Sequence, residues 1–167
     1  QVEPLPDGGQ REEWLVEGRR HRTDGPALVE RNDAGVVVCE RWWVEDHYHR
    51  TDGPAVVKRN DAGVVVCEQW WAEGRCHRVD GPAWVEYNTA GMVVHEQWWV
   101  KGRRHRVDGP AVVRRNDAGV VTYEGWCVAD KDVTPAEVLR VFLADKGVKG
   151  LSPEALEFLG RNRTYEQ

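Results

Sequence analysis

Apolar and polar positions repeat in the same order every 28 residues along most of this chain. The first tryptophan of each repeat marks the spacing, at Trp14, Trp42, Trp70, Trp98 and Trp126. Stretches such as 36–44, between a turn and the paired tryptophans, are rich in valine and aromatic residues, which favour β-strands. The pattern therefore predicts four equal β-hairpin repeats and a partial fifth.

Two turn motifs divide each repeat. Asn-Asp-Ala-Gly, first at 32–35, has the composition of a type I turn followed by a glycine with positive φ. Glu-Gly at 73–74 is typical of a two-residue hairpin turn, and the second repeat has Glu-Asp at 45–46. Each repeat thus provides two strands, and the Gly-Pro in the middle of the returning strand predicts a bend or break there.

The expected fold is mainly β. It is an antiparallel hairpin repeat array, a meander of eight or nine strands, forming either an open twisted sheet or a coiled ribbon. We divide the chain into an N-terminal extension (1–13), a repeat domain (14–130) and a helical C-terminal cap (131–167). In the cap, Thr-Pro-Ala-Glu at 134–137 is a capping box, Gly147 ends that helix, and Ser-Pro-Glu at 152–154 starts a second. The cap either covers the last strand or binds a partner of its own.

A glutamate and an arginine also recur in every repeat. We expect each glutamate to pair with a repeat-related arginine across strands, which would help to fix the register. The glutamates are Glu40, Glu68, Glu96 and Glu124, and the arginines are Arg22, Arg50, Arg78 and Arg106.

Charge disfavours a nucleic-acid-binding protein, because 23 basic and 28 acidic residues give a net charge of −5. The fourth repeat is an exception, with six basic and three acidic residues over 98–125. This basic end is either an ordinary solvated surface or a docking patch for an acidic protein partner. No apolar run approaches the roughly 20 residues of a membrane span, so none is expected.

The four cysteines form no C-x-x-C pair. Cys39 and Cys67 hold the same position in successive repeats, which lie about 10 Å apart in a hairpin array. Because a disulfide needs Cα atoms within about 7 Å, and one metal ion cannot reach both sulfurs, we expect reduced cysteines and no metal. Reduced cysteines suit a cytoplasmic protein, and no cofactor is expected.

The H-R-x-D-G-P-A motif places His and Asp three residues apart, as a metal site or an acid–base pair could require. It occurs intact four times, whereas an active site is usually one asymmetric constellation, so a structural role is favoured over a row of equivalent ligand sites. No common hydrolase, phosphate-loop or zinc motif is present, and no catalytic residue is expected. The residues assigned to building the repeat are Trp42, Trp70, Trp98, His49, Asp52, His77, Asp80, His105 and Asp108.

Departures from the repeat are better candidates for binding. The second tryptophan of each pair is present only in the middle repeats, and the third repeat has aromatic residues where the others have aliphatic ones or arginine. Exposed aromatic and arginine side chains are favoured anchors for protein partners, although the aromatic changes could also be compensating repacking. The candidate partner-binding residues are Trp43, Trp71, Trp84, Tyr87, Trp99, Arg103, Arg104, Arg114 and Arg115.

The W-W-V-x-G-x-x-H-R-x-D-G-P-A stretches at 42–55, 70–83 and 98–111 resemble MORN-like hairpin repeats. They are most similar to the variant in bacterial and phage proteins of the YwqK antitoxin-like group, and the similarity covers about 14–130. Standard MORN repeats are shorter, richer in Gly and Tyr, and lack the D-G-P-A box. The resemblance implies β-hairpin sheets that contact proteins or membrane lipids, without known catalysis.

The sequence therefore favours a non-enzymatic protein–protein interaction module of a bacterium or phage, which could neutralise a toxin or a defence protein. One alternative is a carbohydrate- or cell-wall-binding repeat protein that holds sugars on tryptophan faces. A hydrolase or nucleotide-binding protein would use the His/Asp boxes, and the four intact boxes disfavour it. Self-association through the sheet edges is a further hypothesis.

Overall fold

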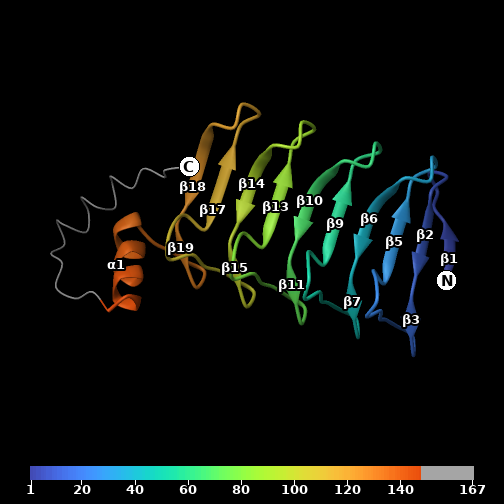
Figure 1. The fold of residues 1–167 in the computed structure, drawn as a ribbon, viewed down its shortest axis with the longest axis horizontal. Coiled ribbons are helices and arrows are strands. Elements are labelled where there is room, and N and C mark those ends of the chain that lie inside the picture. The colour runs from blue at the N-terminus through green and yellow to red at the C-terminus, as the bar shows by residue number, and fades with distance from the viewer. Residues whose placement is uncertain (148–167) are drawn as a thin grey trace.

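Within the residues that the structure describes, ten strands pair in chain order into one open antiparallel sheet, as Figure 1 shows for the computed structural model. The structure describes residues 1–147 of the 167. The expected hairpin repeat array is confirmed in its open form, with ten strands in place of eight or nine. The strands are β1 (Val2–Pro4), β2 (Gln10–Glu13), β5 (Leu28–Arg31), β6 (Val37–Arg41), β9 (Val56–Arg59), β10 (Val65–Gln69), β13 (Trp84–Tyr87), β14 (Val93–Gln97), β17 (Val112–Arg115) and β18 (Val121–Gly125).

Each repeat also carries a small hairpin that leaves the main sheet at the first tryptophan. The returning strand is interrupted across 49–55, as the Gly-Pro motif predicts, and the outgoing strand is also interrupted at Trp42, which was not predicted. Neighbouring small hairpins are joined by backbone hydrogen bonds, such as that from the Gly74 amide to the Tyr48 carbonyl at 3.0 Å. The small hairpins are β3 (Leu15–Val16) with β4 (Arg19–Arg20), β7 (Trp43–Val44) with β8 (His47–Tyr48), β11 (Trp71–Ala72) with β12 (Arg75–Cys76), β15 (Trp99–Val100) with β16 (Arg103–Arg104), and β19 (Cys127–Val128) with β20 (Lys131–Asp132).

Both turn predictions are confirmed. In the second repeat the Asn60 side-chain oxygen accepts the amides of Ala62 and Val64 at 3.1 and 3.0 Å, and Gly63 has φ +83°. In the small hairpin, Glu73 and Gly74 have φ values of +51° and +72°. Positive φ at both central residues is the type I′ pattern, whose twist matches that of the flanking strands.

The register of the main sheet sorts side chains onto two faces, because residues paired across strands point to the same side. A β-bulge in each repeat, such as that between Val65 and Cys67, interrupts the simple alternation expected from the sequence. One face, here called the aromatic face, carries Arg41, Val56, Gln69, Trp84, Gln97 and Val112 in one row. The other, here called the glutamate face, carries Glu12, Val29, Glu40, Val57, Glu68, Val85, Glu96, Val113 and Glu124.

The core is thin and lies on both faces of the sheet. Val56 and Val57 point to opposite faces, yet they are only 3% and 5% exposed. A single sheet can bury both only if long side chains cover each face. At the bend, four alanines have no exposed surface, and their carbonyls accept the amide of the first tryptophan; they are Ala27, Ala55, Ala83 and Ala111. The four cysteines are free and buried; they are Cys39, Cys67, Cys76 and Cys127.

The two ends of the array differ. At the N-terminus, residues of the expected extension form β1 and β2. β1 pairs with β2 and β2 pairs with β5, so the extension continues the main sheet. At the other end, α1 (Pro135–Asp145) begins with the predicted capping box and buries Val138 and Leu139 (Figure 1). The second predicted helix lies outside the described residues. With 11 residues, α1 is shorter than a membrane span requires, and no helix within 1–147 is long and apolar enough to cross a bilayer.

Candidate interaction faces of the sheet

The R-x-D-G-P motif builds the same local cluster in four repeats. In the second, the Arg50 guanidinium lies over the Trp42 ring, 4.0 Å from its centroid, and donates to Asp52 at 2.8 Å and to the Pro54 carbonyl at 3.3 Å. The hydrogen bond from the guanidinium holds the pKa of Asp52 below its ordinary value. The same stacking recurs for Arg22 on Trp14, Arg78 on Trp70 and Arg106 on Trp98. These constant residues therefore make contacts within their own repeat.

The histidine of the motif connects one repeat to the next. His49 Nδ1 accepts the Glu73 amide at 3.2 Å, and the same bond recurs from Lys101 to His77 and from Ala129 to His105. A nitrogen that accepts a backbone hydrogen bond is not free to ligate a metal ion. Within residues 1–147, no group of three or more His, Cys, Asp or Glu residues is arranged to hold one.

Two of the four recurring glutamates pair with arginines, and the predicted partners are wrong. Glu40 pairs with Arg59 at 2.6 Å, and Glu96 pairs with Arg115. Arg50 is one of the arginines that were predicted as partners, but it lies outside the main sheet, at the bend, and pairs with Asp52 instead. Tyr87 stands at the arginine position of the third repeat and donates to Glu68 at 2.7 Å. Burial, together with that carboxylate, raises the pKa of Tyr87.

Three tryptophans bind polar side chains on the aromatic face around β13. Gln69, Trp84 and Gln97 lie side by side on adjacent strands, and the indole N–H groups of Trp71 and Trp99 donate to the two glutamine side chains at 3.1 and 3.0 Å. Trp84 itself donates to Glu86 at 3.0 Å, and Glu86 also lies 3.3 Å from His95. The three tryptophans are half-buried, so part of each ring faces solvent. We call these seven residues the tryptophan–amide cluster.

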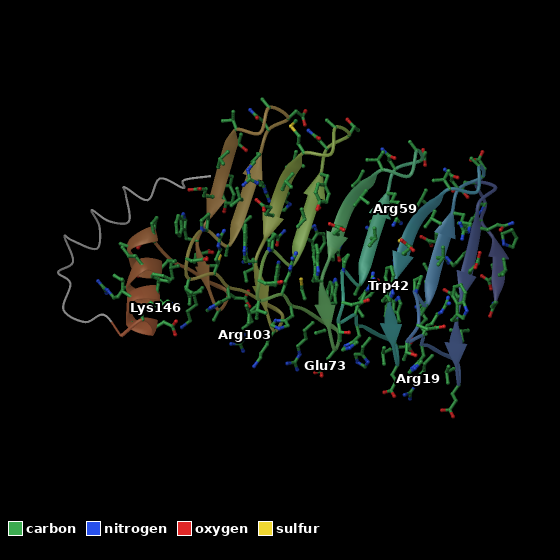
Figure 2. The ribbon with its side chains drawn as sticks, in the orientation of Figure 1. Arg19, Trp42, Arg59, Glu73, Arg103 and Lys146 are labelled. Carbon is green, nitrogen blue, oxygen red and sulfur yellow. The ribbon has the colours of Figure 1, made fainter. Side chains whose placement is uncertain are left out.

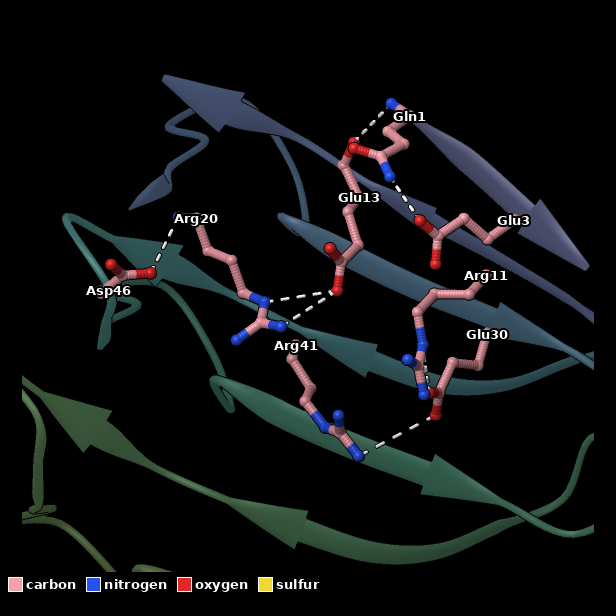
Figure 3. Close-up of polar contacts among 8 residues, drawn as sticks. All are labelled: Gln1, Glu3, Arg11, Glu13, Arg20, Glu30, Arg41 and Asp46. Carbon is pink, nitrogen blue, oxygen red and sulfur yellow. Dashed lines mark hydrogen bonds and ion pairs between the residues drawn. The ribbon is translucent and has the colours of Figure 1, made fainter. Parts of the chain in front are cut away.

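The aromatic face of the first two repeats has a different composition, dominated by ion pairs (Figure 3). There Arg11 and Arg41 converge on Glu30 at 2.7 and 3.8 Å, and Arg20 pairs with Glu13 at 3.1 Å. Trp43, the second tryptophan of the pair in the second repeat, stacks on Tyr48 with ring centroids 3.8 Å apart. Its buried indole N–H has no hydrogen-bond partner among the described residues, because Arg41 stands where the next two repeats have glutamine.

The four candidate arginines of the fourth repeat do not form one patch. Arg114 is exposed and faces the Tyr123 ring on the aromatic face, whereas Arg115 points to the glutamate face and is held by Glu96. Arg103 and Arg104 lie on the small hairpin β15–β16. Tyr87 is likewise on the opposite face from Trp84. Of the sequence candidates, Trp84 lies between Gln69 and Gln97, the two glutamines to which Trp71 and Trp99 donate.

The small hairpins border two grooves that no sequence pattern indicated. A groove of about 970 Å³ lies beside Trp42, and its charged lining comprises four carboxylates and two arginines: Asp24, Glu45, Asp52, Glu73, Arg22 and Arg50. A smaller groove of about 320 Å³ lies further along the array and is lined by Arg75, Lys101, Arg103 and His105. The charge on this side of the molecule therefore changes sign between the two halves of the array.

The cysteines are poor candidates for nucleophiles. A reactive thiol needs a lowered pKa, usually from a nearby cation or a helix N-terminus. Here burial raises the pKa of Cys76 to about 12, and it also raises the pKa values of Cys39 and Cys67.

Comparison of the chain with family models, with curated proteins and with solved structures gives no match.

Proposed function

We propose that this chain is a non-enzymatic binding protein that holds a protein partner on the tryptophan–amide cluster. The observation that carries the proposal is the row of Gln69, Trp84 and Gln97 on the aromatic face. The indole N–H groups of Trp71 and Trp99 donate to its two glutamines. Half-exposed tryptophans that are held rigidly lose little conformational entropy on binding and supply a large contact area. The hydrogen bonds to Gln69 and Gln97 provide that rigidity.

The same hydrogen bonds favour a protein partner over a carbohydrate. A sugar site combines an aromatic face with polar groups that are free to bind hydroxyls. In the cluster, Gln69, Gln97 and Glu86 accept the indole N–H groups of the three tryptophans, so their acceptor capacity is partly used inside the protein. What remains is mainly apolar ring surface, which suits the apolar side chains of a protein.

The resemblance to MORN-like repeats of the YwqK antitoxin-like group extends the proposal. We propose a bacterial or phage protein that acts in the cytoplasm, and a toxin or defence protein as its target. Four cysteines that are free and buried are compatible with a reducing compartment.

Two substitutions that restore the common repeat sequence test the proposal. Trp84→Val introduces the residue of the second and fourth repeats, and Tyr87→Arg does the same on the opposite face of the same strand. We expect Trp84→Val to weaken partner capture at least tenfold, as removal of a hot-spot tryptophan does, and Tyr87→Arg to leave it unchanged. Affinity capture from the native host, quantified by mass spectrometry, measures both.

Both variants should unfold cooperatively, since each new residue already occupies that position elsewhere in the sheet. Equal capture by Trp84→Val and the unmodified protein would exclude the cluster as the binding surface. Quenching of tryptophan fluorescence by cell-wall glycans, abolished by Trp84→Val, would instead favour the carbohydrate alternative.

A further inference from the structure

The turns of the five small hairpins form a single row, here called the hairpin rim. It consists of the two turn residues and the residue after them in each repeat, at 17–19, 45–47, 73–75, 101–103 and 129–131. All fifteen residues are exposed. Figure 2 shows Arg19, Glu73 and Arg103 of the rim along one edge of the molecule. Since each repeat adds two strands, successive turns stand about 10 Å apart.

The charge of the rim is antisymmetric about its central turn. The second turn carries Glu45 and Asp46 and has a charge of −2, whereas the fourth carries Lys101 and Arg103 and has a charge of +2. The first, third and fifth turns each combine one acidic and one basic residue and are neutral. A half-turn rotation about the third turn, 73–75, would therefore place each charged turn opposite the other.

The charges of the second and fourth turns are not neutralised within the fold. In the part of the chain that the structure describes, the Glu45, Lys101 and Arg103 side chains make no ion pair. Asp46 accepts the backbone amide of Arg20 at 2.8 Å but has no cationic partner. These charges are therefore available to a second molecule.

We infer that the rim binds a second copy of this chain, antiparallel, around a twofold axis at turn 73–75. Turn 45–47 of each copy then faces turn 101–103 of the other, which gives two equivalent contacts of opposite charge. A twofold dimer requires a self-complementary surface, and the antisymmetric charge pattern meets that requirement. A parallel arrangement would place like charges against each other and is disfavoured. The inference is argued from the charges of the rim alone, so it does not rest on the proposed function.

Exchanging turns between repeats tests the inference with sequences that this fold already contains. In the basic variant, Glu45→Lys/Asp46→Gly/His47→Arg copies the fourth turn into the second repeat. In the acidic variant, Lys101→Glu/Gly102→Asp/Arg103→His copies the second turn into the fourth repeat. Each variant alone presents like charges to a second copy, and we expect its self-association to weaken at least tenfold relative to the unmodified protein. Sedimentation velocity at low ionic strength measures the association constants.

Mixing the two variants gives the sharper result. The basic variant and the acidic variant are complementary at both contacts, so an equimolar mixture should form a dimer more strongly than either variant does alone. A chain that carries both exchanges should also regain association. As the contacts are electrostatic, raising the ionic strength from about 0.02 M to about 0.5 M should weaken association of the unmodified chain.

Asp61→Lys serves as the control, because this exposed residue lies in the Asn-Asp-Ala-Gly turn at the other end of the hairpin. It should leave association unchanged, and circular dichroism should show that all variants are folded. A monomeric unmodified protein at low ionic strength would overturn the inference. So would folded single-exchange variants that associate as strongly as the unmodified chain, or a mixture of the two that stays monomeric.

Discussion

At the scale of the residue, the D-G-P sequence follows from the packing of one guanidinium group. In each of the four clusters the arginine stacks on the first tryptophan, donates to the aspartate and the proline carbonyl, and lies against the glycine. A Cβ on Gly53 would stand 3.0 Å from Arg50 Cζ, and a Cβ on Gly109 would stand 2.8 Å from Arg106 Cζ. Glycine is thus required by the close approach of a side chain that is already held at three points.

Gly109→Ala should therefore destabilise the fold by about 1–3 kcal/mol, the usual cost of overpacking a fixed site. The measurement is the free energy of unfolding in urea. In the background of Arg106→Ala the obstacle is absent, and the same glycine substitution should cost much less. Equal costs in both backgrounds would exclude the guanidinium as the cause.

The clusters also make stability depend on pH. The arginine hydrogen bonds lower the pKa values of Asp24, Asp52 and Asp80 in the folded protein. An aspartate with a lowered folded-state pKa stabilises the fold above its unfolded pKa of about 3.9, and this contribution is lost as the pH falls through the folded-state value.

We expect Asp80→Asn to reduce the stability at neutral pH and to make the loss of stability on acidification below about pH 4 shallower. Urea unfolding at several pH values between neutral and acid measures this slope. Asp61→Asn is the matched control, since the Asp61 side chain makes no ion pair within residues 1–147. A slope unchanged by Asp80→Asn would contradict the assignment.

At the scale of the element, the type I′ turns contain residues that do not favour their backbone conformation. Glu17, Glu45, Glu73, Lys101 and Ala129 all have φ near +51°, a left-handed conformation that is costly for residues other than glycine, asparagine and aspartate. The hairpin rim therefore keeps charged residues at some expense in stability. This pattern is what a surface selected for its charge would produce.

Glu73→Asn should raise the free energy of unfolding by about 0.5–1 kcal/mol, because Asn-Gly is the preferred type I′ sequence. Thermal and urea unfolding both measure the change. The same replacement at exposed Glu3, outside any turn, should alter stability by less than about 0.5 kcal/mol. A neutral or negative effect at residue 73 would mean that its side chain contributes more to the fold than its backbone costs.

The turns were the most predictable elements from sequence, whereas the bends and bulges were not. Asn60 and Gly63 fix their turn through local chemistry that any reading of the sequence includes. The interruption of the outgoing strand at Trp42 depends on residues elsewhere in the repeat. The Trp42 amide donates to the Ala55 carbonyl, and Arg50 stacks on the Trp42 ring. The bulge next to Cys67 has no signal such as glycine, and it shifts which side chains share a face.

The candidate site was predictable only in part for the same reason. Periodicity singled out the third repeat as different. Alternation along a strand would also have placed Trp84 and Tyr87 on opposite faces, but the sequence candidates grouped them together. The glutamine side chains that join the tryptophans were also missed. Gln69 and Gln97 hold the same position in the second and third repeats, where the first repeat has Arg41 and the fourth has Gly125. That change of residue type was the available signal.

At the scale of the whole molecule, stability comes from contacts between neighbouring repeats. The strand order of the main sheet follows the chain without a crossover, so no strand depends on another that is distant in sequence. Deleting 42–69 joins Arg41 to Trp70 and keeps every remaining residue in phase with its repeat. We expect this shortened chain to fold, with a smaller denaturant dependence of the unfolding free energy because less surface is buried.

Urea unfolding followed by circular dichroism checks this expectation. Deletion of 42–55, half a repeat, is the control, since it would join an outgoing strand directly to a returning strand without the small hairpin between them. That chain should lose cooperative unfolding. If the full-repeat deletion also fails to fold, the repeats are not independent units and the nearest-neighbour description is wrong.

The sequential order of strands has a mechanical consequence. β1 and α1 lie at opposite ends of the long axis, and the strands run across that axis (Figure 1). Tension between these ends would load the interstrand hydrogen bonds one pair at a time, as in the opening of a zipper, rather than shearing many together. Each released repeat would add about 95 Å of contour length, from 28 residues at about 3.4 Å each. In an optical trap the protein should therefore extend at low force, in evenly spaced steps.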